Sequence, residues 1–318
     1  MPIEGGYVGM VDREVFDEWL RQRARAVGAD LRHGVYEQIT RGSDGVAVVH
    51  YRSAGRGRSE AVQVRARAVI GADGAMSAVA KQNIAGADRI RYVAAYHEIV
   101  RVPAALASDK YAGTRCDVYY QGKLSPDFYA WIFPHGATAS IGVGSANKGF
   151  SLRGAVSDLR EISGLTGVET IRREGAPIPM KPLPRWDNGR DVVLAGDASG
   201  VVAPASGEGI YYAMAGGRFA ARAVTLYLKS GDARMLRHAR RDFMKAHGTV
   251  FWVLGIMQRF WYSTDKRRER FVSICRDPDV QRLTWQAYMH KKLVRAKPFT
   301  HVRIFAKDMA HLLGLVRA

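Results

Sequence analysis

Apolar residues recur every three or four positions along residues 12–29, which is the spacing of an amphipathic helix. The apolar positions are Val15, Phe16, Trp19, Leu20, Ala24 and Val27. Asp12 stands where an N-cap residue belongs, and Gly28 stands where a helix commonly ends. The pattern therefore predicts a helix over 12–29 with one apolar face.

After residue 30 the pattern changes to short alternations of apolar and polar residues, separated by turns that contain glycine. These alternations predict strands over 34–40, 45–52 and 61–67, and antiparallel strands over 91–101, 116–120, 128–133 and 140–145. Between the two groups, residues 69–74 predict a short buried strand that is stopped by Gly-Ala-Asp-Gly. Residues 75–82 predict a short helix.

Helical patterns dominate the rest of the chain. Residues 151–163 predict a helix, 181–184 form an extended linker with two prolines, and the chain from about 215 onward is mostly helical. Breaks are expected at Ser230-Gly-Asp, at Asp277-Pro278 and at Lys297-Pro298, because glycine and proline interrupt helices.

The segment from 190 to 210 carries the strongest chemical signal. A buried strand over 192–195 ends abruptly in Gly196-Asp197, and a helical run begins at Ile210. The loop between them carries Gly200, Pro204, Gly207 and Gly209. Glycines let backbone N–H groups approach a ligand, and a helix N-terminus attracts negative charge. The segment predicts a site for a phosphorylated or polyhydroxylated cofactor, with an ordinary strand–helix turn as the alternative.

Composition narrows the class of protein. The chain has 318 residues, of which 47% are hydrophobic, so a sizeable core is expected. Cys116 and Cys275 lie far apart, which argues against a disulfide scaffold, a zinc site and a dithiol redox centre. No signal-peptide pattern is visible, and no apolar run approaches the roughly 20 residues that span a bilayer. We therefore expect a cytoplasmic protein without a metal.

A formal net charge of +18 indicates either an acidic partner or a basic solvated surface. Nucleic acid, an anionic membrane and phosphorylated substrates are the candidate partners. Arginine is scattered over the whole chain, which fits a solvated surface equally well. No nucleic-acid-binding motif is present, so we expect no nucleic-acid partner.

Residues 250–270 combine an apolar helical pattern with a basic cluster. The apolar row is Val250, Leu254, Met257 and Trp261, flanked by Trp252 and Phe260, and the basic cluster is Lys266, Arg267, Arg268 and Arg270. Such a pairing is typical of a helix that lies on an anionic membrane surface. A core helix followed by a solvated basic helix explains the pattern equally well.

Two strand-end turns, Asp73-Gly74 and Gly196-Asp197, are separated by the mainly antiparallel β region. This arrangement resembles the FAD-binding fold of the flavoprotein hydroxylase and reductase superfamily, and residues 13–20 are similar to an early helix of that fold. Within the superfamily the chain resembles the geranylgeranyl reductase family. The matching stretches are 7–20, 129–134, 180–218 and 250–290, and the most specific are 203–214 and 260–271.

The resemblance implies an α/β (α+β) fold with a flavoprotein hydroxylase/reductase-like FAD-binding part. The expected segments are 1–85 (partial FAD-binding domain), 86–180 (antiparallel β substrate domain), 181–228 (second part of the FAD-binding domain) and 229–318 (helical C-terminal region). One departure is the first βαβ unit, whose GxGxxG turn holds the ADP half of FAD and has no counterpart here. Gly142-Val-Gly144 lacks the third glycine and lies in a β context. We therefore expect an N-terminally truncated chain that binds FAD poorly.

The resemblance also implies roles for individual residues. Cofactor contacts are expected from Arg13, Asp73, Gly74, Gly196, Asp197, Gly207, Gly209 and Ile210, and the loop that faces the flavin carries Pro204, Gly207, Glu208 and Gly209. An apolar substrate groove is expected to be lined by Tyr129, Trp131, Phe133 and Tyr211. For any single one of these aromatics, plain core packing is the favoured interpretation. Glu208 fits a loop or cap residue better than a general acid, and no proton donor is identified.

The activity that the resemblance implies is reduction of a geranylgeranyl chain to phytyl. NADPH reduces bound FAD, the flavin passes a hydride to an isolated C=C bond, and a proton reaches the other carbon. The implied substrate is geranylgeranylated bacteriochlorophyll or geranylgeranyl diphosphate, in bacteriochlorophyll biosynthesis, with peripheral contact to the photosynthetic membrane. Other prenyl lipids as substrates, and a non-catalytic remnant without FAD, are the alternatives.

Overall fold

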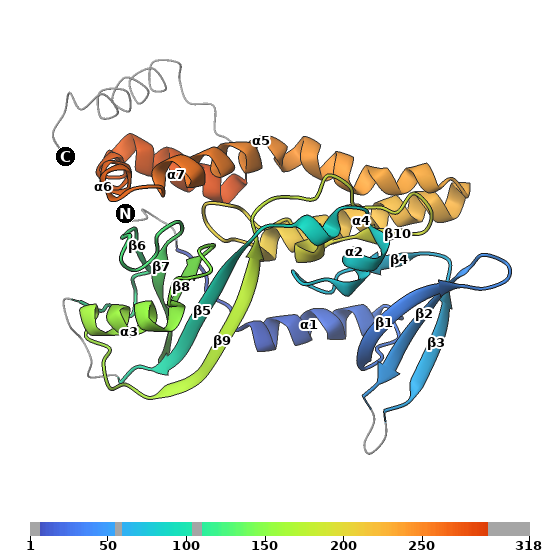
Figure 1. Ribbon diagram of the computed structural model, residues 1–318, viewed down its shortest axis with the longest axis horizontal. Helices are drawn as coiled ribbons and strands as arrows, with labels where there is room; N and C mark the ends of the chain where they lie inside the picture. Colours follow the sequence, from blue (N-terminus) through green and yellow to red (C-terminus); the bar gives the residue numbers. More distant parts are fainter. Residues whose placement is uncertain (1–6, 55–58, 104–109, 292–318) are drawn as a thin grey trace.

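The fold combines two antiparallel sheets, a short parallel pair of strands and a helical C-terminal region (Figure 1). The computed structural model describes residues 7–54, 59–103 and 110–291. Its helices are α1 (Arg13–Ala26), α2 (Ala78–Asn83), α3 (Leu152–Ile162), α4 (Ile210–Ser230), α5 (His238–Trp261), α6 (Asp265–Ile274) and α7 (Pro278–His290), with short 3-10 turns η1 (Ala87–Arg89), η2 (Gly196–Ser199) and η3 (Ala233–Arg237). Its strands are β1 (Gly34–Arg41), β2 (Ala47–Ser53), β3 (Ala61–Ala66), β4 (Val69–Gly71), β5 (Tyr92–Arg101), β6 (Asp117–Tyr119), β7 (Ala130–His135), β8 (Thr138–Ser145), β9 (Thr170–Pro179) and β10 (Val192–Leu194).

The first sheet confirms the strand prediction for residues 34–67. Its strand order is β1-β2-β3, and both pairings are antiparallel. A bulge between Tyr36 and Gln38 shifts the register of β1 against β2. Alternation and glycine turns are local signals, so this sheet could be predicted without knowing any distant partner.

The second sheet has five strands in the order β6-β7-β8-β5-β9. Helix α3 covers one face, where Leu159 joins Ile141 in a buried cluster. The four strands expected here are confirmed, whereas the sequence pattern does not predict β9. Most of β9 is exposed, and Gly175 and Pro177 interrupt its alternation. It forms at the edge of the sheet because it pairs with almost the whole of β5.

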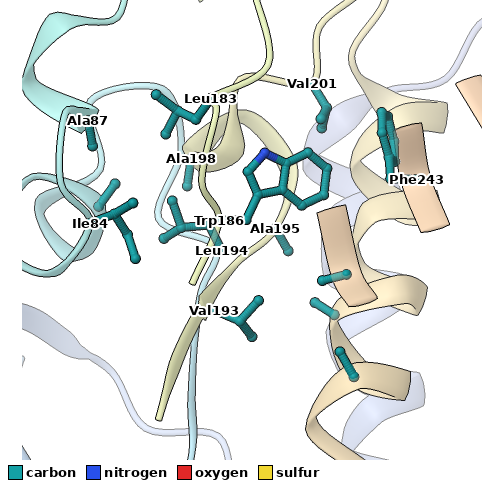
Figure 2. Packing of buried hydrophobic residues seen from close by; sticks show 14 of the residues in the cluster. Ile84, Ala87, Leu183, Trp186, Val193, Leu194, Ala195, Ala198, Val201 and Phe243 are labelled. Atoms are coloured by element: carbon teal, nitrogen blue, oxygen red, sulfur yellow. The ribbon is translucent and has the colours of Figure 1, made fainter. Parts of the chain in front are cut away.

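Strands β4 and β10 form the parallel pair, and in Figure 1 they lie between α1 on one side and α4 and α5 on the other. All of β10 is buried, whereas Ile70 is 40% exposed, so the strand predicted to be buried around Ile70 is buried on one face only. Figure 2 shows Trp186 between β10 and Phe243 of α5, with the two ring centroids 5.1 Å apart. This core anchors the strand ends against the helices.

Helix α1 has the ends that the sequence predicts. Asp12 accepts a hydrogen bond from the Glu14 N–H at 3.0 Å, and Gly28 follows with a φ of 98°. Its predicted apolar face covers no core in the described part of the chain: no α1 residue is buried, and Val15 and Trp19 are 69% and 50% exposed. The pattern predicted the helix correctly but not the environment of its apolar face.

The helical C-terminal region follows the predicted breaks with one addition. Gly231, with a φ of 71°, ends α4, and Asp277 caps α7, both where breaks are predicted. The break over 262–264 was missed because it contains neither glycine nor proline; Thr264 caps α6 there. The break expected at Lys297-Pro298 lies outside the described residues. Within the described ranges, no helix has the length and apolar character needed to cross a membrane.

Candidate cofactor and substrate site

The two predicted strand-end turns lie at one edge of the parallel pair. Strands β4 and β10 run in the same direction, with Gly71 opposite Leu194. Asp73-Gly74 and Gly196-Asp197 therefore leave the sheet at the same end. The crevice outside the carboxyl ends of parallel strands is where open α/β sheets bind their ligands.

The turn after β10 depends on two glycines in the left-handed region of backbone conformation. Gly196 has a φ of 62°, and a Cβ at this position would lie 3.5 Å from the Cβ of Ala213 in α4. Gly200 has a φ of 82°, and a Cβ there would clash with the carbonyl oxygen of Lys181. The approach at Gly196 brings the strand end against the first turn of α4, and the approach at Gly200 packs the turn against the linker at Lys181.

Two tyrosine hydroxyls hold the loop between β10 and α4. Tyr129, the residue before β7, donates to the carbonyl oxygen of Ser206 at 2.5 Å. Tyr262, the residue after α5, donates to the carbonyl oxygen of Ala205 at 2.9 Å. Gly207 has a φ of 65°, and a Cβ there would lie 3.0 Å from the Tyr129 hydroxyl. Side chains from the second sheet and from the helical region thus fix this loop together.

Helix α4 begins without a side-chain cap among the described residues. Its N-cap is Gly209, and a Cβ at that position would lie 3.5 Å from Oδ1 of Asp197. Unpaired N–H groups and the helix dipole make such a helix end favourable for negative charge. Asp197, Gly207, Gly209 and Ile210, all predicted to contact the cofactor, therefore lie around one helix N-terminus.

Asp197 and Arg13 come together from distant parts of the chain. Burial raises the pKa of Asp197, and the positive charge of Arg13 opposes that rise. Arg13 donates two hydrogen bonds of 2.8 Å to the carboxylate of Asp17. Hydrogen bonding to Asp17 raises the pKa of Arg13, and the charge of Asp197 adds to the effect. The predicted residues Arg13 and Asp197 are therefore electrostatic neighbours at the crevice.

Asp73 has a structural task in addition to its predicted place near the cofactor. Its carboxylate accepts hydrogen bonds from the Ser77 hydroxyl at 2.5 Å and from the Val79 N–H at 3.1 Å. Both bonds hold the beginning of α2. Gly74 has a φ of 81° with open space around it. Asp73 thus shapes the turn, and the half-buried backbone of Gly74, with open space beside its Cα, is what this turn offers to a ligand.

Glu208 is tied to the far end of the helical region. Its Oε1 lies 2.5 Å from Nζ of Lys291, and the two side chains are only 19% and 11% exposed. The Nζ atom of Lys291 also lies 3.8 Å from the ring centroid of Tyr288. The interpretation of Glu208 as a loop residue agrees with this ion pair, which the sequence did not reveal because its partner lies 83 positions away.

Three of the four predicted substrate aromatics share one face of the second sheet. Tyr129, Trp131 and Phe133 alternate along β7, with centroid distances of 5.9 Å for Tyr129–Trp131 and 6.1 Å for Trp131–Phe133. We call these three residues the aromatic row. Trp131 and Phe133 are half-buried, on the face opposite α3. Tyr211 lies elsewhere, with its ring centroid 5.2 Å from Tyr212 and 5.7 Å from His247.

A polar network beside the aromatic row was missed by the sequence analysis. Trp131 donates through Nε1 to the Ser140 hydroxyl at 3.2 Å, and Nδ1 of His97 lies 3.0 Å from the same hydroxyl. Nε2 of His97 lies 3.0 Å from Oε2 of Glu174. Burial lowers the pKa of His97, and Glu174 opposes that effect. Glu174 belongs to the unpredicted strand β9, so no sequence signal could have joined these residues.

In residues 250–270, one member of the basic cluster departs from both interpretations, because Arg268 is buried. The side chain of Arg268 is 3% exposed, and it donates to the carbonyl oxygens of Tyr262 and Pro126. Leu254, from the predicted apolar row, packs against two buried clusters, so the alternative of a core helix is correct for that residue. Trp252, predicted only as a flanking residue, is 68% exposed.

The residues at this end of the parallel pair would suit the ribityl and ring end of a flavin. An uncapped helix N-terminus suits an electron-rich ring, the Asp197 carboxylate suits sugar-like hydroxyls, and the glycines leave room for close contact. The described residues contain no glycine-rich strand–helix turn beside β4 for the ADP end. Poor retention of FAD therefore stays a prediction.

Comparison with known proteins identifies the lineage of this fold. Residues 3–246 match the family model "FAD binding domain". The geranylgeranyl diphosphate reductase of Rhodobacter capsulatus is 55% identical over 99% of this chain and 79% of its own length. The enzyme of that name from a Synechocystis species is 36% identical over 96% of this chain and 77% of its own length.

A solved structure supports the same fold. The geranylgeranyl bacteriochlorophyll reductase-like protein of Thermoplasma acidophilum superposes with a TM-score of 0.71 at 21% identity, covering 81% of this chain and 66% of its own. The family match and this superposition confirm the predicted flavoprotein hydroxylase-like fold.

Proposed function

This chain belongs to the FAD-binding flavoproteins and, within them, to the geranylgeranyl diphosphate reductases, and on that premise we propose that it reduces geranylgeranyl chains to phytyl with electrons from NADPH. Tyr129 is the observation that carries the proposal. Its hydroxyl holds Ser206 in the loop before α4, while its ring begins the aromatic row beside Trp131. One residue thus joins a cofactor crevice to a half-buried apolar surface, as a flavin-dependent prenyl reductase requires.

Each part of the site has a task in this reaction. Bound FAD supplies two-electron hydride chemistry. The N-terminus of α4 stabilises negative charge on the flavin ring, and Asp197 accepts hydrogen bonds from the ribityl hydroxyls. Trp131 and Phe133 bind the apolar chain and exclude water. Arg13 balances the charge of Asp197.

The isoprenoid chain can arrive on geranylgeranylated bacteriochlorophyll or on geranylgeranyl diphosphate, and both place the reaction in bacteriochlorophyll biosynthesis. Peripheral contact with the photosynthetic membrane is part of the proposal. Its support is Trp252 and Ile256, which are 68% and 48% exposed one turn apart on α5.

The test is an anaerobic assay with the purified chain, FAD and NADPH. Absorbance first measures how much FAD the chain retains, and geranylgeranyl-bacteriochlorophyll and geranylgeranyl diphosphate are then added in parallel. We expect reoxidation of the flavin and products that have gained hydrogen pairs, detected by mass spectrometry. If the chain retains FAD but neither compound reoxidises the reduced flavin, the proposal is contradicted. If the chain never binds FAD, the non-catalytic alternative is supported.

A further inference from the structure

Four strands of the second sheet place side chains in a single line across the face that carries the aromatic row. Trp131 of β7 lies opposite Gly142 of β8, Gly142 lies opposite His97 of β5, and His97 lies opposite Glu174 of β9. Side chains directly opposite one another on one face of a sheet are within contact distance. The line therefore joins an indole, an imidazole and a carboxylate.

Gly142 is what lets the indole reach the imidazole. A Cβ at this position would clash with the indole of Trp131 and would lie 2.7 Å from the Cβ of His97. With no side chain between them, Trp131 and His97 approach to a ring-centroid distance of 6.3 Å. Both rings reach the Ser140 hydroxyl, which lies on β8 between them.

The line continues from the sheet to the cofactor crevice. Oε1 of Glu174 lies 2.7 Å from Nε of Arg172, and Arg172 forms an ion pair with Glu14 of α1. The residue before Glu14 is Arg13, the electrostatic neighbour of Asp197. The polar contacts of His97 therefore extend through Glu174 and Arg172 to Glu14 of α1, which is next to Arg13 in the sequence.

The charges around His97 come from β9 and α1. Glu174 is adjacent, Arg172 and Glu14 lie behind it, and the facing groups of β7 and β8 are the neutral Trp131 and Ser140. The His97 side chain is 26% exposed, so water can return a proton to it. Burial lowers the pKa of His97, so its protonated imidazolium is a stronger acid than that of an exposed histidine.

An isolated C=C bond needs a proton donor because it has no heteroatom to carry negative charge. Resting on the proposed function, we propose that His97 supplies the proton of the prenyl reduction through the Ser140 hydroxyl, with Glu174 as its positioning residue. The π electrons of the C=C bond take the proton of the Ser140 hydroxyl while the Ser140 oxygen takes the proton from Nδ1, and the N–H bonding pair stays on Nδ1. The other carbon receives the hydride that the reduced flavin supplies. Nε2 keeps its hydrogen bond to Glu174, and the Ser140 hydroxyl turns its hydrogen to the bare Nδ1.

The test compares His97→Gln with His135→Gln, a control at the end of the same sheet. Flavin reduction by NADPH and flavin reoxidation by the prenyl substrate are followed separately by stopped flow. We expect His97→Gln to slow reoxidation by about 100-fold or more, the usual size of general-acid catalysis, and to leave reduction unchanged. Circular dichroism and thermal unfolding verify that both variants fold.

A readout without substrate or cofactor probes the same residue. The NMR signal of the His97 ring is titrated with pH in the wild type, in Glu174→Gln and in Arg172→Met. Loss of the Glu174 charge lowers the pKa of His97, whereas loss of the Arg172 charge raises it, and the upper limit of the reoxidation pH profile should move with each.

Two results would overturn the assignment of His97. Reoxidation of His97→Gln at the wild-type rate with an unchanged pH profile removes His97 as the donor but leaves the proposed function intact. If the wild-type chain retains FAD but neither prenyl substrate reoxidises the reduced flavin, the proposed function is wrong, and the role of His97 is wrong with it.

Discussion

The proposed cofactor crevice and the proposed prenyl-binding face of the second sheet are built by different means. The crevice consists mainly of backbone, with left-handed glycines, two strand ends and an uncapped helix N-terminus around Asp197. The sheet face consists of side chains in register across four strands, with Gly142 as the gap between them. A backbone site suits the invariant parts of a cofactor, whereas a side-chain face can be adjusted to its substrate one residue at a time.

The backbone nature of the crevice predicts the largest effect for Gly200→Ala. A Cβ there meets a carbonyl oxygen that cannot move without moving the chain, and the left-handed conformation adds strain. We expect the free energy of unfolding to fall by about 3 kcal/mol, measured by urea denaturation.

Gly189→Ala is the matched control for this variant. Gly189 has a φ of 72°, but a Cβ there has nothing within 4 Å. Its free energy of unfolding should fall by about 1 kcal/mol, because only the left-handed backbone conformation opposes a side chain there. Equal losses in the two variants would show that close approach at Gly200 contributes nothing.

On the sheet face, Gly142→Ala should have an intermediate effect. The added methyl group overlaps an indole that can rotate away and the Cβ of His97, which cannot, so we expect the free energy of unfolding to fall by about 1–3 kcal/mol in urea denaturation. The near-ultraviolet circular dichroism of Trp131 should change with it. Gly175→Ala in β9 is the control, because its nearest atom is at an ordinary 3.5 Å. If Gly142→Ala and Gly175→Ala lower the free energy of unfolding equally, Trp131 and His97 are not closely packed against Gly142.

The smallest effect on stability is expected for Asp197→Asn. Unlike the glycine variants, this variant should be more stable than the wild type. Burial raises the pKa of Asp197 in the folded chain, so its ionised form opposes folding once the pH rises above the unfolded value. Without FAD, the variant should be more stable at pH 7 by up to about 1 kcal/mol, and this gain should vanish near pH 3. Thermal unfolding at both pH values measures it.

The same variant, although more stable, should bind FAD more weakly. Loss of the carboxylate removes a charged hydrogen-bond acceptor, so FAD should bind about tenfold more weakly in an absorbance titration. Asp187→Asn, outside the crevice, should bind FAD as the wild type does. Unchanged affinity in Asp197→Asn would contradict the placement of this residue at the ribityl group.

The two regions also differ in how far the sequence predicts them. Gly196, Asp197 and Gly207 lie within one continuous segment, and their turn chemistry is local, so the crevice could be read directly from the chain. The meeting of Trp131 with His97 depends on strand register, and Glu174 comes from a strand whose alternation is broken. Periodicity likewise predicted the helix around Trp19 but could not say what its apolar face contacts.

The two tyrosine hydroxyls that hold the adjacent carbonyls of Ala205 and Ser206 have a thermodynamic consequence. Because Tyr129 is bonded to the loop before α4, a ligand that displaced Tyr129 on the sheet would also displace that loop, and the converse would hold for a ligand at α4. Linkage is reciprocal, so an isoprenoid that tightens flavin binding by some factor must itself bind more tightly, by the same factor, when the flavin is present. With such coupling, occupancy of the isoprenoid site and occupancy of the flavin site would rise together.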